Sequence, residues 1–139
     1  MKSILEKAMA DTSLNLKFSM DSYYDSKGNI NGGRFSLYSL PNFELVTIFT
    51  LEQMKGCNGI VISRRVEITP DFRGKGYGSA FCTMRENIAR HFGFSLIVCT
   101  IVVGNIPQEK IMAKNGWQKM VDFTNKKTSN NVSLYYKQL

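Results

Sequence analysis

The chain has 139 residues, of which 43% are hydrophobic and 21% are charged, and its formal net charge is +7. This length is enough for one hydrophobic core but not for two, so we expect a single domain that spans residues 1–139. The composition is typical of a folded soluble protein. No segment approaches the roughly 18 uncharged apolar residues of a membrane-spanning helix. Because the N-terminus also lacks the long apolar segment of a signal peptide, we expect a cytoplasmic protein without a membrane partner.

The cysteines and the histidine give little support to a disulfide or a metal site. Cys57, Cys82 and Cys99 are an odd number of widely spaced thiols, which predicts reduced side chains, two of them within apolar patterns. His91 is the only histidine and no Cys-x-x-Cys pair accompanies it, so we predict no metal site.

The positive charge is unevenly distributed along the chain. The first 62 residues hold equal numbers of basic and acidic side chains, so the whole excess falls in the remainder. Such an excess favours an anionic partner, which could be a nucleic acid, an acidic protein or a multiply phosphorylated small ligand. A solvated basic surface without any partner explains it equally well.

The first half of the chain has the pattern of a short helix followed by antiparallel strands. Residues 1–10 have the pattern of an amphipathic helix, after which apolar and polar residues alternate strictly at 14–20. Clusters of turn-forming residues at 25–29 and 31–33 predict the connection to the next strand. Strands joined by such short links are antiparallel neighbours. We expect three or four of them, drawn from residues 14–20, 34–40, 43–51 and 60–69.

A glycine-rich loop at residues 73–79 lies between the strand that ends before Pro70 and a helical pattern at 80–92. Glycine can adopt positive φ and lets a ligand approach the backbone, so the three glycines of this loop can turn several amides toward one anion. The following helix adds its positive end. The spacing matches neither a Walker A loop nor a dinucleotide fingerprint. The alternative is a strand-to-helix turn that binds nothing.

The second half of the chain changes to a helical period and then returns to strands. The apolar stripe at residues 80–92 predicts a helix that ends at a glycine. The uncharged apolar residues 95–103 predict a central strand that is buried on both faces and parallel to 60–69. Pro107 suits the first turn of a short helix at 108–115. A closing hairpin is expected at residues 117–123 and 132–136.

This order of elements, together with two motifs, resembles the GNAT superfamily of acyl-CoA-dependent N-acetyltransferases. The signature Arg/Gln-x-x-Gly-x-Gly/Ala of the family is matched by Arg73, Gly76 and Gly78. A second element, an Asn after the buried strand with a Gly-aromatic pair further on, is matched by Asn105 and by Gly116 with Trp117. The resemblance implies an α+β fold, in which helices flank a mixed sheet whose parallel fourth and fifth strands splay apart.

The resemblance also implies that acetyl-CoA is the acyl donor. In the family, the pyrophosphate of coenzyme A lies on the glycine loop and the start of the next helix, and the pantetheine arm runs between the splayed strands. Val66 and Ile68 would offer main-chain groups to this arm, and one amide would polarise the thioester carbonyl. The cofactor-binding residues that it implies are Val66, Ile68, Thr69, Arg73, Gly74, Lys75, Gly76, Tyr77, Gly78, Ser79 and Asn105.

The catalytic base does not follow from the family pattern. Many members place Glu or His five residues before the Asn, where this chain has Thr100. Glu67 is the only carboxylate in the strand before the loop and lies close to the expected thioester, so it is the candidate base. An ion pair of Glu67 with Arg64 or Arg65 is at least as good an explanation of this residue.

The usual general acid is also missing. The family often has a tyrosine seven residues after the Asn, and this chain has Met112 there. A thiol is a fair leaving group without help, so the change weakens catalysis without excluding it. Tyr135 or Tyr136 on the closing hairpin could act in its place, with Tyr135 as the candidate acid, although a tyrosine there is more often part of the packing.

The resemblance therefore implies an N-acetyltransferase that transfers an acetyl group to a primary amine of a small molecule, peptide or protein by direct attack on the thioester. The alternative is a catalytically weakened GNAT-like module that binds a protein or nucleic-acid partner, which the missing base and acid favour. The basic C-terminal half would suit a nucleic acid or an acidic protein as partner. The acceptor and the oligomeric state, a dimer included, stay open.

Overall fold

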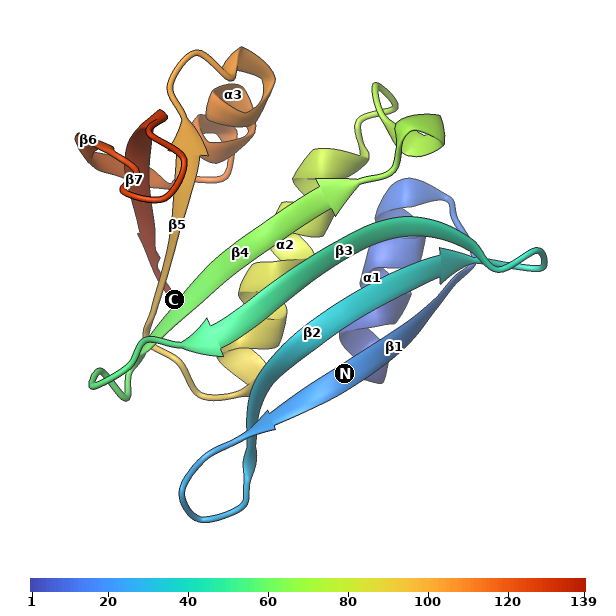
Figure 1. Ribbon diagram of the computed structural model, residues 1–139. Helices are drawn as coiled ribbons and strands as arrows, with labels where there is room; N and C mark the ends of the chain where they lie inside the picture. The colour runs from blue at the N-terminus through green and yellow to red at the C-terminus, as the bar shows by residue number, and fades with distance from the viewer.

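A seven-stranded mixed sheet in the order β1-β2-β3-β4-β5-β7-β6 forms the centre of the protein (Figure 1). The computed structural model describes all 139 residues. The strands are β1 (Leu16–Tyr24), β2 (Ile30–Ser39), β3 (Glu44–Gln53), β4 (Ile60–Ile68), β5 (Leu96–Val102), β6 (Gln118–Thr124) and β7 (Asn131–Gln138). The helices are α1 (Lys2–Thr12), α2 (Tyr77–His91) and α3 (Ile106–Lys114), and a short 3-10 helix spans Pro70–Phe72. None of these helices combines the length and apolar content needed to cross a bilayer.

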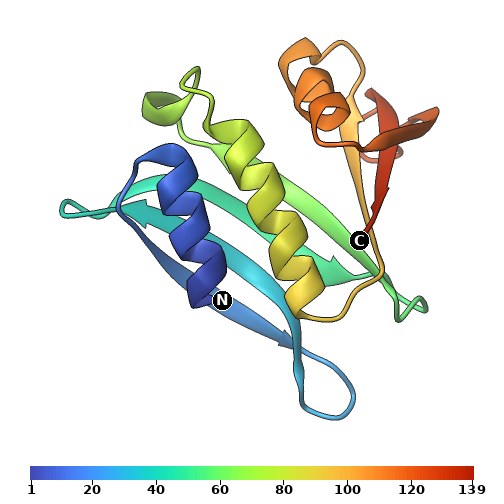
Figure 2. The same ribbon diagram turned by 180° about the vertical axis from the view of Figure 1, so that it is seen from behind.

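The first four strands form an antiparallel meander that α1 and α2 cover on one face (Figure 2). The apolar stripe of α2 packs into the core, where Phe81, Met84 and Ile88 are buried. Phe35 and Phe49, which pair across β2 and β3, stack with their ring centroids 5.0 Å apart. The prediction of antiparallel strands in this half is therefore confirmed, because alternating apolar residues bury one face of the sheet under the helices.

The predicted turn at residues 31–33 is wrong, because these residues belong to β2. Gly32 and Gly33 allow β2 to lie close to its neighbouring strands. A Cβ at Gly32 would lie 2.4 Å from the carbonyl oxygen of Leu51 on β3, and one at Gly33 would lie 2.6 Å from the carbonyl oxygen of Asp21 on β1. The glycines thus allow tight strand contact rather than a change of direction.

β4 and β5 are parallel and separate after a short paired stretch. They pair only at Ile60 with Leu96, Val61 with Ile97 and Ile62 with Val98, after which they diverge (Figure 1). The predicted parallel pair is confirmed, but the prediction that the fifth strand is buried on both faces is wrong for its second half. Thr100 and Val102 are exposed there, because β4 no longer lies beside them. The result is a gap between the two strands that opens toward α3.

A buried carboxylate joins α2 to the C-terminal part of the sheet. The side chain of Glu86 accepts hydrogen bonds from the indole Nε1 of Trp117 at 3.1 Å and from Nζ of Lys137 on β7. Lys137 also donates to the carbonyl oxygen of Asn115 at 2.6 Å, just after α3. These contacts fix β7 and the end of α3 against α2. They therefore hold the wall of the gap that faces β4.

Two of the three free thiols are buried, as their apolar surroundings predicted. Burial raises the pKa of the Cys82 thiol to about 11 and that of Cys99 to about 12. Only the thiolate reacts with alkylating reagents. We therefore expect iodoacetamide at pH 8 to modify Cys57 alone in the folded protein, and all three cysteines in urea, as measured by mass spectrometry. Rapid modification of Cys82 or Cys99 without denaturant would contradict this packing.

Candidate functional site

The glycine loop before α2 presents unpaired backbone amides. Gly74 and Gly76 have φ values of 72° and 79°, in the left-handed region that favours glycine. The amides of residues 74–76 donate to no backbone acceptor, and Gly76 caps α2 without a side-chain hydrogen bond. The first amides of a helix have no partner within the helix. The loop therefore directs several N–H groups and the positive end of α2 toward the same point, which is suited to an anion.

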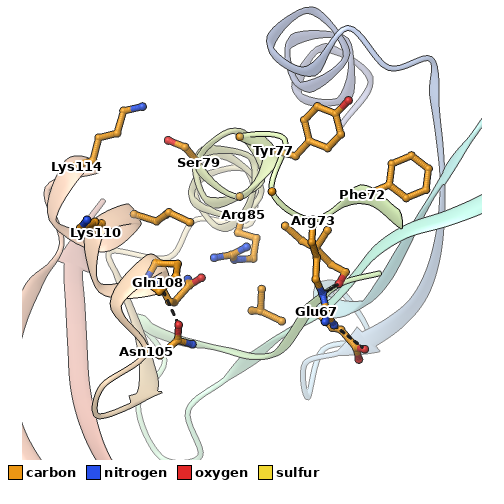
Figure 3. Close-up of a pocket in the computed structure, with 17 residues that line it drawn as sticks. Glu67, Phe72, Arg73, Tyr77, Ser79, Arg85, Asn105, Gln108, Lys110 and Lys114 are labelled. Atoms are coloured by element: carbon orange, nitrogen blue, oxygen red, sulfur yellow. Dashed lines mark hydrogen bonds and ion pairs between the residues drawn. The ribbon is translucent and has the colours of Figure 1, made fainter. Parts of the chain in front are cut away.

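These amides face a cavity of about 770 Å³ between β4, α2 and α3 (Figure 3). Basic side chains surround it, since α3 contributes Lys110 and Lys114 and the loop contributes Arg73. Its lining consists of Val66, Glu67, Ile68, Phe72, Arg73, Gly74, Gly76, Tyr77, Gly78, Ser79, Arg85, Asn105, Pro107, Gln108, Lys110, Ile111 and Lys114. The size and charge of this cavity suit an elongated ligand with phosphate groups.

The structure brings all but two of the predicted cofactor-binding residues to this cavity. Lys75 is not in the lining, because its Nζ lies over the ring of Phe72, 5.7 Å from the centroid. Thr69 is not in the lining either, because its hydroxyl donates to the carbonyl oxygen of Leu45 at 2.6 Å. Both side chains stabilise the connection between β4 and the loop instead of facing the cavity.

Arg73 connects the loop to the end of β4. Its Nε donates to the carbonyl oxygen of Ile68 at 2.6 Å, and its guanidinium lies 3.8 Å from the carboxylate of Glu67 (Figure 3). The predicted ion pair of Glu67 with Arg64 or Arg65 is therefore wrong. Arg64 instead donates from Nε to Glu52 at 3.0 Å. The pair of Glu67 and Arg73 is exposed and long, so it holds the carboxylate only weakly.

Asn105 begins the opposite wall of the cavity. It is the N-cap of α3, and its side-chain oxygen accepts a hydrogen bond from the amide of Gln108 at 3.4 Å. Pro107 in the first turn suits this start, because a proline needs no amide partner there. Gly78 lets α2 and α3 approach, since a Cβ at this position would lie 2.7 Å from Cδ1 of Ile111.

A second cavity of about 310 Å³ lies beside the first, in the gap between β4 and β5. Both cavities share Val66, Arg85, Asn105 and Gln108, so they adjoin at the floor of the gap. The positions where the family pattern would have a base and an acid, Thr100 and Met112, line this second cavity. The remaining lining residues are Ser63, Arg64, Arg65, Cys99, Ile101 and Val102.

The structure does not bring Tyr135 to either cavity. This side chain is 7% exposed and belongs to the core on β7, where it is paired with Cys99 of β5. Burial, with a smaller effect of Glu109, raises the pKa of Tyr135, which makes it a weaker acid than an exposed tyrosine. Its placement thus agrees with a packing role.

Several lining residues were not predicted from the sequence, although some carry a signal that could have revealed them. Arg85 follows Phe81 by four residues and precedes Ile88 by three, so a charged side chain interrupts the apolar stripe of α2. Lys110 and Lys114 are four residues apart and therefore lie on one face of α3. Charged side chains are almost never fully buried unless they are paired, so a charge on an apolar stripe is a signal of a polar partner or a ligand.

No family model and no curated protein sequence matches the chain, whereas solved structures do. One solved structure, provisionally described as a phosphinothricin N-acetyltransferase, has a TM-score of 0.74 at 14% identity. The match covers 90% of this chain and 99% of that chain. A GNAT-family acetyltransferase from Bacillus anthracis has a TM-score of 0.65 at 16% identity, over 76% of this chain and 65% of that chain. Spermidine N-acetyltransferase from Vibrio cholerae, in complex with CoA and spermine, has a TM-score of 0.68 at 13% identity, over 78% of this chain and 66% of that chain.

These similarities establish the fold. The chain has the seven-stranded mixed sheet of the GNAT acetyltransferases, with its parallel fourth and fifth strands separated, as the resemblance implied. It spans nearly the whole of the first of these structures and about two thirds of the other two.

Proposed function

We propose that the protein is an N-acetyltransferase that uses acetyl-CoA to acetylate a primary amine. The main support for this proposal is that the two cavities of the site adjoin each other. Unpaired amides at the start of α2 face a basic cavity, and this cavity adjoins a gap between two parallel strands. The spermidine N-acetyltransferase of the same fold, which was solved with CoA, supports the choice of ligand.

The residues present fit coenzyme A. The loop amides, Lys110 and Lys114 would hold its phosphate groups at the wide end of the cavity. Beyond Ile62, the edge of β4 that faces β5 has no strand partner, so the main chain near Val66 and Ile68 can pair with the amides of the pantetheine arm. When bound, acetyl-CoA supplies a thioester carbonyl that an amine can attack.

Attack on this carbonyl requires a neutral amine. An alkyl amine has a reference pKa near 10.4, so a base must remove a proton at neutral pH. Glu67 is the candidate, because it lines the cavity and its side chain is 57% exposed, held only by the long contact with Arg73. It would accept the proton directly or through water. A backbone amide near Val66 would donate to the oxygen on which negative charge develops.

The departing thiolate has no obvious proton donor. Met112 is 2% exposed and lines the gap at the position of the usual tyrosine, and Tyr135 lies in the core. A thiol of ordinary acidity leaves without a general acid, at a cost of up to about 10²–10⁴ in rate. We therefore propose a slow enzyme rather than an inactive one.

A binding module without catalysis is the second candidate, and the missing acid favours it. Lys110 and Lys114 line the proposed cofactor cavity, so part of the basic excess is explained without a nucleic-acid partner. Incubation with acetyl-CoA and a panel of amines, amino acids and peptides decides between the two. The proposed enzyme releases free thiol with at least one acceptor, whereas thiol release that never exceeds the rate of hydrolysis would favour the module.

Replacing Glu67 by glutamine should lower kcat/KM about 100-fold or more while the affinity for acetyl-CoA stays within threefold, since a base acts only in the chemical step. The rate is measured by thiol release and the affinity by calorimetry. Asp71→Asn removes an exposed carboxylate nearby that does not line the cavity, and it should keep the wild-type rate. A wild-type rate for Glu67→Gln would exclude Glu67 as the base.

A further inference from the structure

Arg85 is a buried arginine without a partner. It projects from the middle of α2 into the space between β4 and α3 and is only 2% exposed (Figure 3). Its Nε is buried without a hydrogen-bond partner, and none of the ion pairs of the protein includes its guanidinium. A guanidinium stays protonated in proteins, so this charge is uncompensated.

A second orphaned polar group lies in the same place. The hydroxyl of Ser63 on β4 is buried and has no hydrogen-bond partner, and Ser63 lines the second cavity together with Arg85. These two groups are the only buried side-chain polar atoms of the chain without partners. Buried polar groups are normally satisfied, and an unpaired buried charge is strongly unfavourable. Two such groups that line one cavity indicate that a ligand completes them.

The charge of the second cavity defines the ligand as an anion. Three arginines and no carboxylate line it, and of these only Arg64 is neutralised, by Glu52. A second ammonium group, as in a polyamine, would meet like charge there. The planar fork of Arg85 with a nearby hydroxyl suits a carboxylate, whose single charge balances one guanidinium. The loop amides and the lysines of α3, in the first cavity, would hold the phosphates of the proposed cofactor.

We propose that Arg85 and Ser63 form a carboxylate-binding subsite in the gap between β4 and β5, so that one of the two reactants carries a carboxylate. The volume of about 310 Å³ is larger than an acetyl group needs. The carboxylate belongs either to the acyl chain, as in succinyl-CoA, or to the acceptor, as in an amino acid. The identity of the reactants rests on the proposed function, but the anion site itself does not.

Thermal unfolding tests the anion site without coenzyme A. Sodium succinate, compared with sodium chloride at equal ionic strength, should raise the Tm of the wild-type protein by about 2 °C or more. Arg85→Gln should abolish this shift, and without succinate its Tm should exceed that of the wild type, because it removes an unpaired buried charge. Arg34→Gln removes an exposed arginine on β2 that lines neither cavity, and it should keep the shift. No shift in the wild type, or an equal shift in Arg85→Gln, would overturn the subsite.

Binding and transfer then distinguish the two sources of the carboxylate. If it belongs to the donor, succinyl-CoA binds at least about 10-fold more tightly than acetyl-CoA, and Arg85→Gln removes the difference. If it belongs to the acceptor, an amino acid has at least about 10-fold higher kcat/KM than its amide with acetyl-CoA, and the same variant removes that difference. Equal weakening of CoA, acetyl-CoA and succinyl-CoA by Arg85→Gln would make Arg85 a cofactor contact and overturn the subsite. A succinate shift without any CoA binding would retain the subsite and refute the proposed function.

Discussion

Replacing Gly76 by glutamate is expected to abolish the binding of acetyl-CoA. Gly76 has a φ of 79° at the N-cap of α2, and a Cβ there would meet no atom within 4 Å, so the new side chain fits but extends into the space beside the loop amides. Its carboxylate would occupy the positive end of the helix and repel the phosphates. We expect Kd to rise at least about 100-fold, which corresponds to about 2.8 kcal/mol, as measured by calorimetric titration.

Gly28→Glu is the matched control for this variant. Gly28 lies in the turn between β1 and β2 with a φ of 81°, and a Cβ there would also meet no atom within 4 Å. The two variants therefore introduce the same charge and the same backbone strain. Gly28→Glu should bind acetyl-CoA like the wild type. Binding by Gly76→Glu within threefold of the wild type, or equal loss in both variants, would refute the assignment of the loop.

Glu86→Ala should destabilise the fold by about 3–5 kcal/mol, which is the usual result of breaking a buried ion pair. The side chain of Glu86 is 3% exposed and accepts from Trp117 and Lys137, so its loss leaves the indole without a partner and the Lys137 charge without its counter-ion. Because Lys137 also holds the carbonyl group after α3, the wall of the cavity should loosen as well. Urea denaturation followed by tryptophan fluorescence, which reports on Trp117, measures the change.

Two further variants separate the buried contact from general effects of the substitution. Glu6→Ala on α1 removes an exposed glutamate whose contact with Lys2 is 3.8 Å long, and it should cost less than about 0.5 kcal/mol. Glu86→Gln combined with Lys137→Met removes both charges and should cost less than Glu86→Ala. A cost below about 1 kcal/mol for Glu86→Ala would show that the network adds little to stability.

The features of the fold that depend on local sequence could be predicted. Alternating apolar residues, turn clusters and the glycine loop predicted the meander, the parallel pair and α2, because these patterns act within a few residues. Gly32 and Gly33 were misassigned to a turn, since their function is to approach β1 and β3, which are distant in sequence. The exposure of Thr100 also depends on a strand that is distant in sequence. It follows from the divergence of β4, which the residues around Thr100 do not encode.

The candidate site was predictable only where one segment forms it. The loop residues other than Lys75 line one cavity together, because loop and helix start are continuous in sequence. The partner of Glu67 could not be predicted, since Arg73 reaches back to β4 across the connection. The lysines of α3 reach the cavity only through tertiary packing. Arg85 was visible as a charge on an apolar stripe, but its lack of a partner is a property of the folded protein alone.

A calorimetric titration of the wild-type protein with acetyl-CoA tests directly whether the cavity binds this cofactor. The basic cavity between α2 and α3 predicts saturable binding at one site per chain, with Kd in the range of about 1 μM to 1 mM that is usual for enzyme substrates. Absence of saturable binding at millimolar acetyl-CoA, by a protein shown to be folded, would contradict the account.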